Sequence, residues 1–163
     1  MAISEEFKHT VGKALGRIPS GLFILTASHG GKSDAMLASW VQQASFDPPT
    51  ISIAVGKGRG IVDLIKTGKT LVISVLPEGD TSLMKRYARG LKPGEDPFAG
   101  VEIVTTAGGG VAMKSAVAWL ECRLLQTCDF GADHELVIAQ VIHGELLHPG
   151  QSFTHQRGNG FHY

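Results

Sequence analysis

Short apolar runs separated by glycine- and proline-containing turns occupy most of the chain. Early runs lie at residues 22–27, 35–45 and 51–55, with turns at Gly30-Gly31 and Asp47-Pro48-Pro49. Later runs lie at residues 71–76, 101–105, 117–128 and 135–147, and glycines 108–110 form a turn between the second and the third of them. Strands at such short spacing, without a helix after each one, predict an antiparallel sheet rather than a parallel one.

Helical spacing of apolar residues occurs in three places. Residues 4–18 combine a serine cap, two early glutamates and apolar residues three or four positions apart, and a proline follows. Residues 60–66 carry apolar side chains on one face, and Asp80 can cap a helix that runs to residue 89 with Leu83 and Tyr87 inward. The predicted fold class is therefore mainly β, a β-barrel with peripheral helices, built as a single domain over residues 1–163.

The charge balance narrows the range of functions. Lys and Arg total 15, Asp and Glu total 15, and the pI is about 7.1. A nucleic-acid-binding or membrane-bound protein usually has a basic surface, so we expect neither partner. The apolar runs are also much shorter than the roughly 20 residues of a membrane-spanning helix.

Cysteine and histidine usage argues against disulfide and metal chemistry. Cys122 and Cys128 lie in one predicted strand, where their separation of roughly 20 Å exceeds disulfide reach. We expect both to be small buried hydrophobic side chains, and two unpaired thiols suit a reducing compartment, so the predicted location is the cytoplasm. The seven histidines show no ligand spacing, and no metal site is expected.

A glycine-rich segment between a predicted strand and a predicted helix is a candidate anion site. Lys57, Gly58 and Arg59 place two cations beside a flexible residue, just before the helix at 60–66. The unsatisfied N–H groups at a helix N-terminus attract negative charge, which favours a phosphate. The alternative interpretation is a solvated turn without a ligand.

The run at residues 35–45 is unusual for a core strand because polar side chains interrupt it. Small side chains let a flat ligand approach the backbone, and hydroxyl and amide groups can bond to its polar edge. The alternative is an edge strand of mixed polarity with its tryptophan in the core. The candidate ligand-binding residues here are Ala38, Ser39, Trp40, Val41, Gln42, Gln43 and Ser45.

Other candidate residues have ordinary explanations. His134 follows Asp133 in a predicted turn, where a histidine is usually just exposed, and a solvated face is expected at Arg86, Arg89 and Lys92. The sequence contains no phosphate-binding P-loop, no dinucleotide-binding glycine motif, no zinc-protease motif and no serine-hydrolase motif.

Several segments together resemble the flavin reductase-like family, whose fold is the FMN-binding split barrel. The resemblance rests on the runs at 21–27, 35–45, 51–55 and 71–76 and on the turn Asp47-Pro48-Pro49, and it extends from about residue 11 to residue 163. Within this family, residues 35–41, 83–85, 93–100 and 155–159 are similar to the C-terminal flavin reductase domain of cyanobacterial flavodiiron proteins.

The resemblance implies a function and a set of site residues. It implies an NAD(P)H:flavin oxidoreductase that binds FMN, with FAD as the alternative flavin and NADH or NADPH as hydride donor. The ring would lie along residues 38–45, with its phosphate held by Lys57 and Arg59. His134 would lie near the flavin and the nicotinamide as the candidate catalytic residue, and Tyr163 would close the site with the tail at 155–157.

The resemblance also implies partners, and it leaves alternatives. A homodimer with flavin sites near the interface is expected, together with a redox partner protein as a further interaction. An FMN-binding electron carrier without its own nicotinamide site would use the same fold and the same flavin residues. A reductase that releases reduced FMN to a partner oxygenase is a third alternative.

Overall fold

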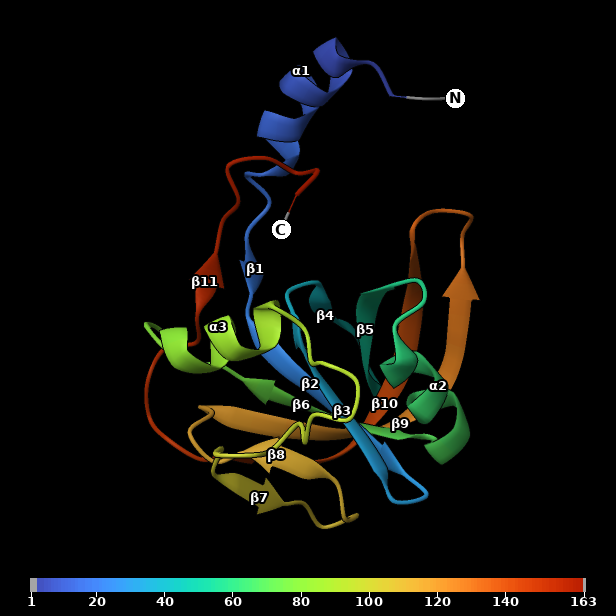
Figure 1. The fold of residues 1–163 in the computed structure, drawn as a ribbon, viewed down its shortest axis with the longest axis vertical. Coiled ribbons are helices and arrows are strands. Elements are labelled where there is room, and N and C mark those ends of the chain that lie inside the picture. Colours follow the sequence, from blue (N-terminus) through green and yellow to red (C-terminus); the bar gives the residue numbers. More distant parts are fainter. Residues whose placement is uncertain (1–2, 163) are drawn as a thin grey trace.

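The computed structural model describes residues 3–162 and shows a strongly curved antiparallel sheet with three helices in that part of the chain (Figure 1). The central sheet has seven strands in the order β3-β2-β6-β9-β10-β5-β4. Every neighbouring pair in it is antiparallel, as the sequence predicts. The strands are β2 (Phe23–His29), β3 (Lys32–Ala38), β4 (Val41–Phe46), β5 (Pro49–Gly56), β6 (Thr70–Val75), β9 (Ala118–Asp129) and β10 (His134–Leu146).

Two small sheets flank the central one. Strand β7 (Ile103–Thr105) pairs with β8 (Val111–Met113), and β1 (Ser20–Gly21) pairs with β11 (Thr154–His155). Strands β1, β8 and β11 are absent from the sequence-based prediction, because two or three residues are too few to show an alternating pattern. Strand β11 lies in the tail after residue 149, where the apolar pattern predicts no strand.

The three helices form where the sequence predicts them. In α1 (Glu5–Leu15), Ser4 Oγ accepts a hydrogen bond of 3.2 Å from the Phe7 N–H. In α3 (Thr81–Ala88), the Asp80 carboxylate accepts from the first-turn N–H groups, and Leu83 and Tyr87 are buried. Helix α2 (Gly60–Gly68) begins directly after the Lys57–Arg59 segment. None of the helices in residues 3–162 is long and apolar enough to cross a membrane.

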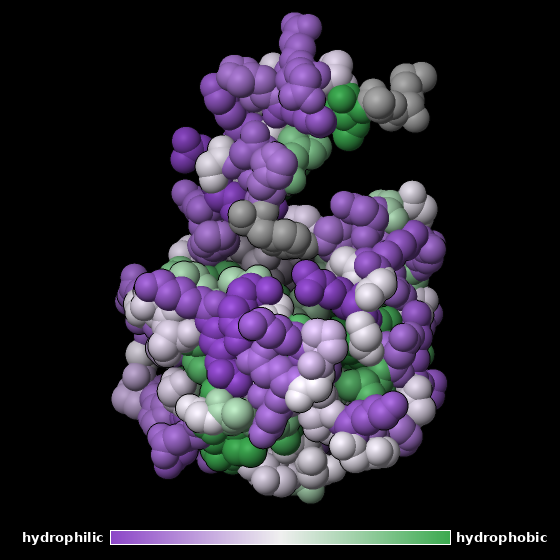
Figure 2. All heavy atoms as spheres, in the orientation of Figure 1, coloured by the Kyte–Doolittle hydropathy of each residue, from purple (hydrophilic) through white to green (hydrophobic). Residues whose placement is uncertain are grey.

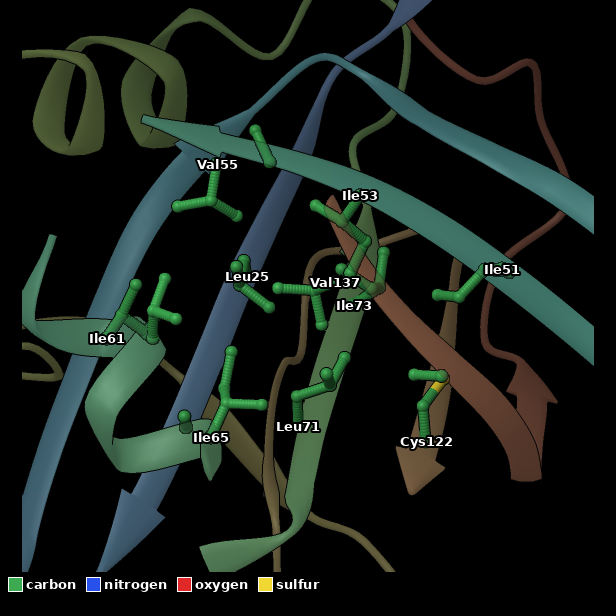
Figure 3. Close-up of a cluster of buried hydrophobic side chains, with 14 residues drawn as sticks. Leu25, Ile51, Ile53, Val55, Ile61, Ile65, Leu71, Ile73, Cys122 and Val137 are labelled. Atoms are coloured by element: carbon green, nitrogen blue, oxygen red, sulfur yellow. The ribbon is translucent and has the colours of Figure 1, made fainter. Parts of the chain in front are cut away.

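The main core lies between the inner face of the sheet and α2 (Figure 3). Leu25, Ile53, Ile65, Ile73 and Val137 are fully buried there and come from four strands and the helix. Burying each such side chain contributes about 1.5–3 kcal/mol through removal of apolar surface from water. Because of this packing, α2 covers one side of the barrel, and the position of its N-terminus is fixed.

The predicted single strand at 35–45 is in fact two strands. Strand β3 ends at Ala38 and β4 begins at Val41, with Ser39 and Trp40 between them. Strands β3 and β4 form opposite edges of the seven-stranded sheet, although they are consecutive in the chain. The chain therefore passes from one sheet edge to the other at these two residues, which leaves the barrel split at this point.

The two cysteines lie in one strand and are not bonded to each other, as expected, but only one of them is buried. Cys122 packs in the main core, while Cys128 is exposed near the end of β9. Burial raises the pKa of the Cys122 thiol to about 12, with a smaller contribution from the neighbouring Glu121 carboxylate. The expectation that both thiols are buried is wrong for Cys128, because that end of β9 extends beyond the core.

Candidate functional site

The split between β3 and β4 gathers aromatic and cationic side chains from distant parts of the chain. The rings of Trp40 and His134 have centroids 4.9 Å apart and are tilted by 48°. The Arg157 guanidinium lies 4.9 Å from the centre of the Trp40 ring. Trp40 is half-buried and belongs to none of the core clusters, so the alternative of a core tryptophan does not hold.

His134 connects this cluster to the glycine-rich segment. It is the first residue of β10 and pairs in register with Gly56 at the end of β5. Its Nδ1 atom lies 2.8 Å from Asp133 Oδ1, and the hydrogen bond from His134 lowers the pKa of that carboxyl. The Lys57 N–H donates a 2.9 Å hydrogen bond to the Asp133 carbonyl. The turn before β10 and the loop before α2 are therefore fixed to each other.

The two cations predicted to hold a phosphate point toward different neighbours. Lys57 Nζ forms a 2.7 Å ion pair with Asp129, and both side chains are substantially exposed. Arg59 extends toward α3, where its Nη1 would lie 3.7 Å from a Cβ at Gly90. Arg59 forms no salt bridge within residues 3–162. Of the two, Arg59 is better placed to receive an anion without first losing a partner.

The N-terminus of α2 is sterically open. Arg59 occupies the cap position without a side-chain hydrogen bond to the first turn. Gly58 has a φ of +81°, and no atom lies within 4 Å of the position a Cβ would take at Gly58 or at Gly60. The space beside the Cα atoms of Gly58 and Gly60 is therefore open, next to a helix N-terminus of the kind that favours phosphate binding.

The other candidate ligand-binding residues fall into two groups, those that face the core and those that face solvent. Ala38 is buried in the main core, and Val41 packs against that core. Gln42 and Gln43 are exposed on β4, and Ser45 is half-buried. Outward side chains of β4 can thus contact a ligand beside Ser39 and Trp40, whereas Ala38 offers only its backbone. Tyr163 lies outside the described residues.

A large cavity lies next to the glycine-rich segment. It has a volume of about 1060 Å³ and contains Gly60, the residue after Arg59. None of residues 38–45 lines it, so it adjoins the predicted ring site rather than coinciding with it. The lining comes from the β2–β3 hairpin, α2 and the loop after α3: His29, Gly30, Lys32, Ser33, Asp34, Gly60, Asp63, Leu64, Thr67, Leu91, Lys92, Pro93, Gly94 and Glu95.

The side chains that line this cavity were not identified as candidates from the sequence. Lys92 and Arg89 are exposed, as expected of a solvated face, and Lys92 also lines the cavity. Arg86 departs from that expectation, because its Nε is buried without a hydrogen-bond partner among the described residues and its guanidinium lies over the Tyr87 ring. The only local signal was the unusual density of charge and glycine at residues 90–95.

Comparison with known proteins places the chain among flavin reductases. Residues 15–160 match the flavin reductase like domain. The chain is 41% identical over 153 residues to diflavin flavoprotein A 1 of Synechocystis sp. (strain ATCC 27184 / PCC 6803 / Kazusa), and the match covers 93% of this chain and 26% of that protein. The chain thus spans about a quarter of the length of the curated relatives it matches.

Solved structures confirm the split-barrel fold. The NADH:FAD oxidoreductase SgcE6 of Streptomyces globisporus C-1027 is similar with a TM-score of 0.85 and 25% identity, over 98% of this chain and 94% of that one. The styrene monooxygenase flavin reductase of Pseudomonas putida S12 shares the fold with a TM-score of 0.74 and 24% identity, over 87% of this chain and 89% of that one. The Streptomyces protein is also known in complex with NAD and FAD fragments.

Proposed function

The chain belongs to the flavin reductase-like family, and we propose that it is an FMN-dependent NAD(P)H oxidoreductase whose flavin site lies at the split between β3 and β4. One observation carries this proposal. The split brings Trp40, His134 and Arg157 together beside a helix N-terminus that is open to an anion. A flat, partly aromatic ligand with a phosphate at one end fits both features.

The residues fit FMN at its two ends. Outward groups of β4 and the backbone at Ser39 can bond the polar edge of a flavin ring. Arg59 and the first-turn N–H groups of α2 can bind its phosphate, and Lys57 can join them by leaving the exposed Asp129. Because an exposed ion pair contributes little free energy, this exchange costs about 1 kcal/mol or less.

FMN bound by these residues would supply the redox chemistry, which is hydride acceptance from NAD(P)H and transfer of two electrons to an acceptor. The role of the protein is to bind the flavin, to orient it and to shield it from solvent. His134 lies between Trp40 and the Asp133 carboxylate, which fixes the orientation of its ring. The Arg157 guanidinium lies over the Trp40 ring, so the C-terminal segment contributes this side chain to the site. We therefore assign His134 to positioning the nicotinamide, rather than to nucleophilic catalysis.

The visible spectrum of the purified protein, recorded before and after anaerobic addition of NADH or NADPH, tests this proposal. Flavin absorbance that bleaches within seconds supports a reductase. Absorbance that persists in the oxidised form identifies an electron carrier without a nicotinamide site, and a chain that takes up neither FMN nor FAD contradicts the proposal. His134→Ala should slow reduction more than it weakens FMN binding.

We also propose a homodimer, because large apolar side chains remain uncovered on the surface. Helix α1 projects away from the barrel (Figure 1), and apolar atoms are visible on its surface (Figure 2). Ile18 is 61% exposed and Phe46, on the edge strand β4, is 90% exposed. A second copy can cover both. Light scattering should give a mass near twice 17.3 kDa, and a monomer would contradict this assembly.

A further inference from the structure

The glycine turn at residues 108–110 lies on a buried glutamate that the proposed flavin chemistry does not use. This turn lies between β7 and β8, and β8 packs against β2 and β6 of the central sheet (Figure 1). The glutamate is Glu121 on β9, which is only 1% exposed. Glutamate is almost never fully buried unless it is paired, so this side chain requires a partner.

The turn is built closely around the Glu121 carboxylate. The Gly108 N–H donates a hydrogen bond of 2.9 Å to Glu121 Oε2. A Cβ at Gly108 would lie 2.5 Å from Glu121 Oε1, and a Cβ at Gly110 would lie 2.5 Å from a methyl group of Val72. Both positions therefore require glycine, because any side chain would push the turn away from the carboxylate.

No positive side chain of residues 3–162 balances this carboxylate. Glu121 takes part in none of the ion pairs that these residues form. Arg123 lies two positions further along β9, on the same face of the strand, but its guanidinium donates a 3.0 Å hydrogen bond to Gln140 on β10. Because burial removes the hydration of an ionised carboxylate, the charge needs a compensating partner from outside the chain.

A second buried polar group lies at the same place. Thr106 is 5% exposed, and its Oγ1 has no hydrogen-bond partner among the described residues. This oxygen lies 3.0 Å from the position that a Cβ would take at Gly110, and Glu121 Oε1 lies 3.2 Å from the same position. A carboxylate oxygen and an unpartnered hydroxyl oxygen therefore converge on one point. Since buried polar groups are almost always satisfied, this convergence indicates a ligand that binds oxygen atoms.

A small cavity lies beside these groups. Its lining includes Glu121 and the three glycines of the turn, and its volume of about 100 Å³ has room for an ion with a few waters. Thr26 Oγ1 also belongs to the lining and donates a 2.6 Å hydrogen bond to the Val111 carbonyl, so its lone pairs remain available to a cation. Ser28 and Thr70 are half-buried, so hydroxyl groups line the route from solvent.

We propose that this cavity binds a monovalent cation, sodium or potassium, next to Glu121. Carboxylate and hydroxyl oxygens suit hard cations. One carboxylate balances one positive charge, and the described part of the chain holds no group of three or more His, Cys, Asp or Glu side chains that could bind a metal ion of higher charge. Trp40, His134 and Arg157 are absent from the lining, so the site does not depend on the proposed flavin function.

Thermal unfolding of the full chain in matched salts tests the site. Potassium chloride or sodium chloride replaces choline chloride at constant total concentration, so charge screening stays the same while the bulky choline cation is a poor ligand for converging oxygens. At a cation concentration roughly tenfold above its Kd, Tm should rise by about 3 °C. The salt that gives the larger rise identifies the preferred ion. Equal Tm values in all three salts overturn the proposal.

Glu121→Gln removes the charge and keeps the shape of the side chain, including an oxygen that can accept from the Gly108 N–H. In this variant the gain from potassium or sodium should disappear. The matched control is Glu145→Gln, which changes an exposed glutamate of β10 and should keep the full gain. A carboxylate with a purely structural role would change Tm by the same amount in every salt, and that result overturns the proposal.

Thr106→Val keeps the test decisive if Glu121→Gln does not fold. Because Thr106 Oγ1 has no hydrogen-bond partner among the described residues, its removal should not lower Tm in choline chloride, whereas the gain from potassium or sodium should shrink. Sodium NMR measures binding directly, since the parent should broaden the sodium signal more than Thr106→Val or Glu121→Gln does. An unchanged gain together with equal line widths overturns the site and leaves the proposed reductase untouched.

Discussion

Strand β9 runs through two regions of the molecule that differ in how their side chains are held. At Cys122 it lies in the sealed region, the core beneath α2 that includes Leu25 and Ile53. At Cys128 it has reached the open region, the split with Trp40 and His134 and the loop before α2. Contacts in the sealed region are apolar and close-packed, so they determine stability. Those in the open region are ring contacts and exposed ion pairs, which contribute little to stability and can be exchanged for a ligand.

The two thiols of β9 should show the largest difference between the regions. The pKa of Cys122 is raised to about 12 by burial. Its thiolate fraction near pH 8 is therefore roughly a thousandfold below that of an ordinary thiol with a pKa of about 8.5. We expect a thiol-specific reagent to label the exposed Cys128 quickly and the buried Cys122 very slowly. Cys128→Ser should remove the fast phase, and a fast phase that persists in this variant would show that the sealed region opens to solvent.

Two leucines allow the same substitution in both regions. Leu25 is fully buried on β2, whereas Leu125 is 51% exposed on β9. Leu25→Ala should lower the free energy of unfolding by about 2–5 kcal/mol, because it leaves a cavity among close-packed neighbours. Leu125→Ala should lower it by less than about 1 kcal/mol. Urea denaturation measures both, and equal losses would mean that the chain is as tightly packed around Leu125 as around Leu25.

The cations of the open region should affect ligand binding rather than stability. Arg59→Ala should weaken FMN by about tenfold and leave riboflavin unchanged, since only FMN carries a phosphate. Lys57→Ala should have a smaller effect because its ammonium already pairs with Asp129. The double variant should show the largest loss for FMN, with riboflavin again unaffected. Fluorescence titration of both flavins gives the comparison, and parallel losses for FMN and riboflavin would exclude these residues as phosphate ligands.

The sealed region was largely predictable from the sequence because its signals are local. The apolar side chains of residues 60–66 lie within one turn or two of each other, and α2 forms there with Ile61 and Ile65 buried in this core. The strands of the core likewise follow apolar runs that a short window reveals. Only the very short strands, such as β8, escaped detection.

The open region was harder to predict because it depends on pairing between distant segments. Nothing in the local pattern separates β3 from β4 at Ser39 and Trp40, since the break arises from β3 pairing with β2 while β4 pairs with β5. The contact of Trp40 with His134 and Arg157 joins segments about a hundred residues apart. The cavity likewise depends on distant segments, because Lys32 comes from a hairpin and Lys92 from a loop that meet only in the folded chain.

The smallest expected effect concerns the hydrogen bond between Asp133 and His134, which orients the His134 ring. The hydrogen bond from His134 lowers the pKa of Asp133 in the folded state, and in the unfolded chain an aspartate has a pKa of about 3.9. A lowered folded pKa means that Asp133 stabilises the fold above about pH 4, and that this contribution disappears as the pH falls through the folded value. Because the Asp133 side chain is 89% exposed, the contribution is small.

Asp133→Asn should therefore lower Tm slightly at pH 7, and the difference should disappear as the pH falls through the folded pKa of Asp133 and the parent carboxyl becomes protonated. Thermal unfolding of both proteins across this pH range measures the difference. Asp129→Asn provides a control within the same region, because the ion pair with Lys57 also lowers the pKa of that carboxyl, although Asp129 does not contact His134. If only Asp133→Asn also slows flavin reduction, the carboxylate acts through the orientation of His134. If both variants slow it equally, the general negative charge of the open region is responsible.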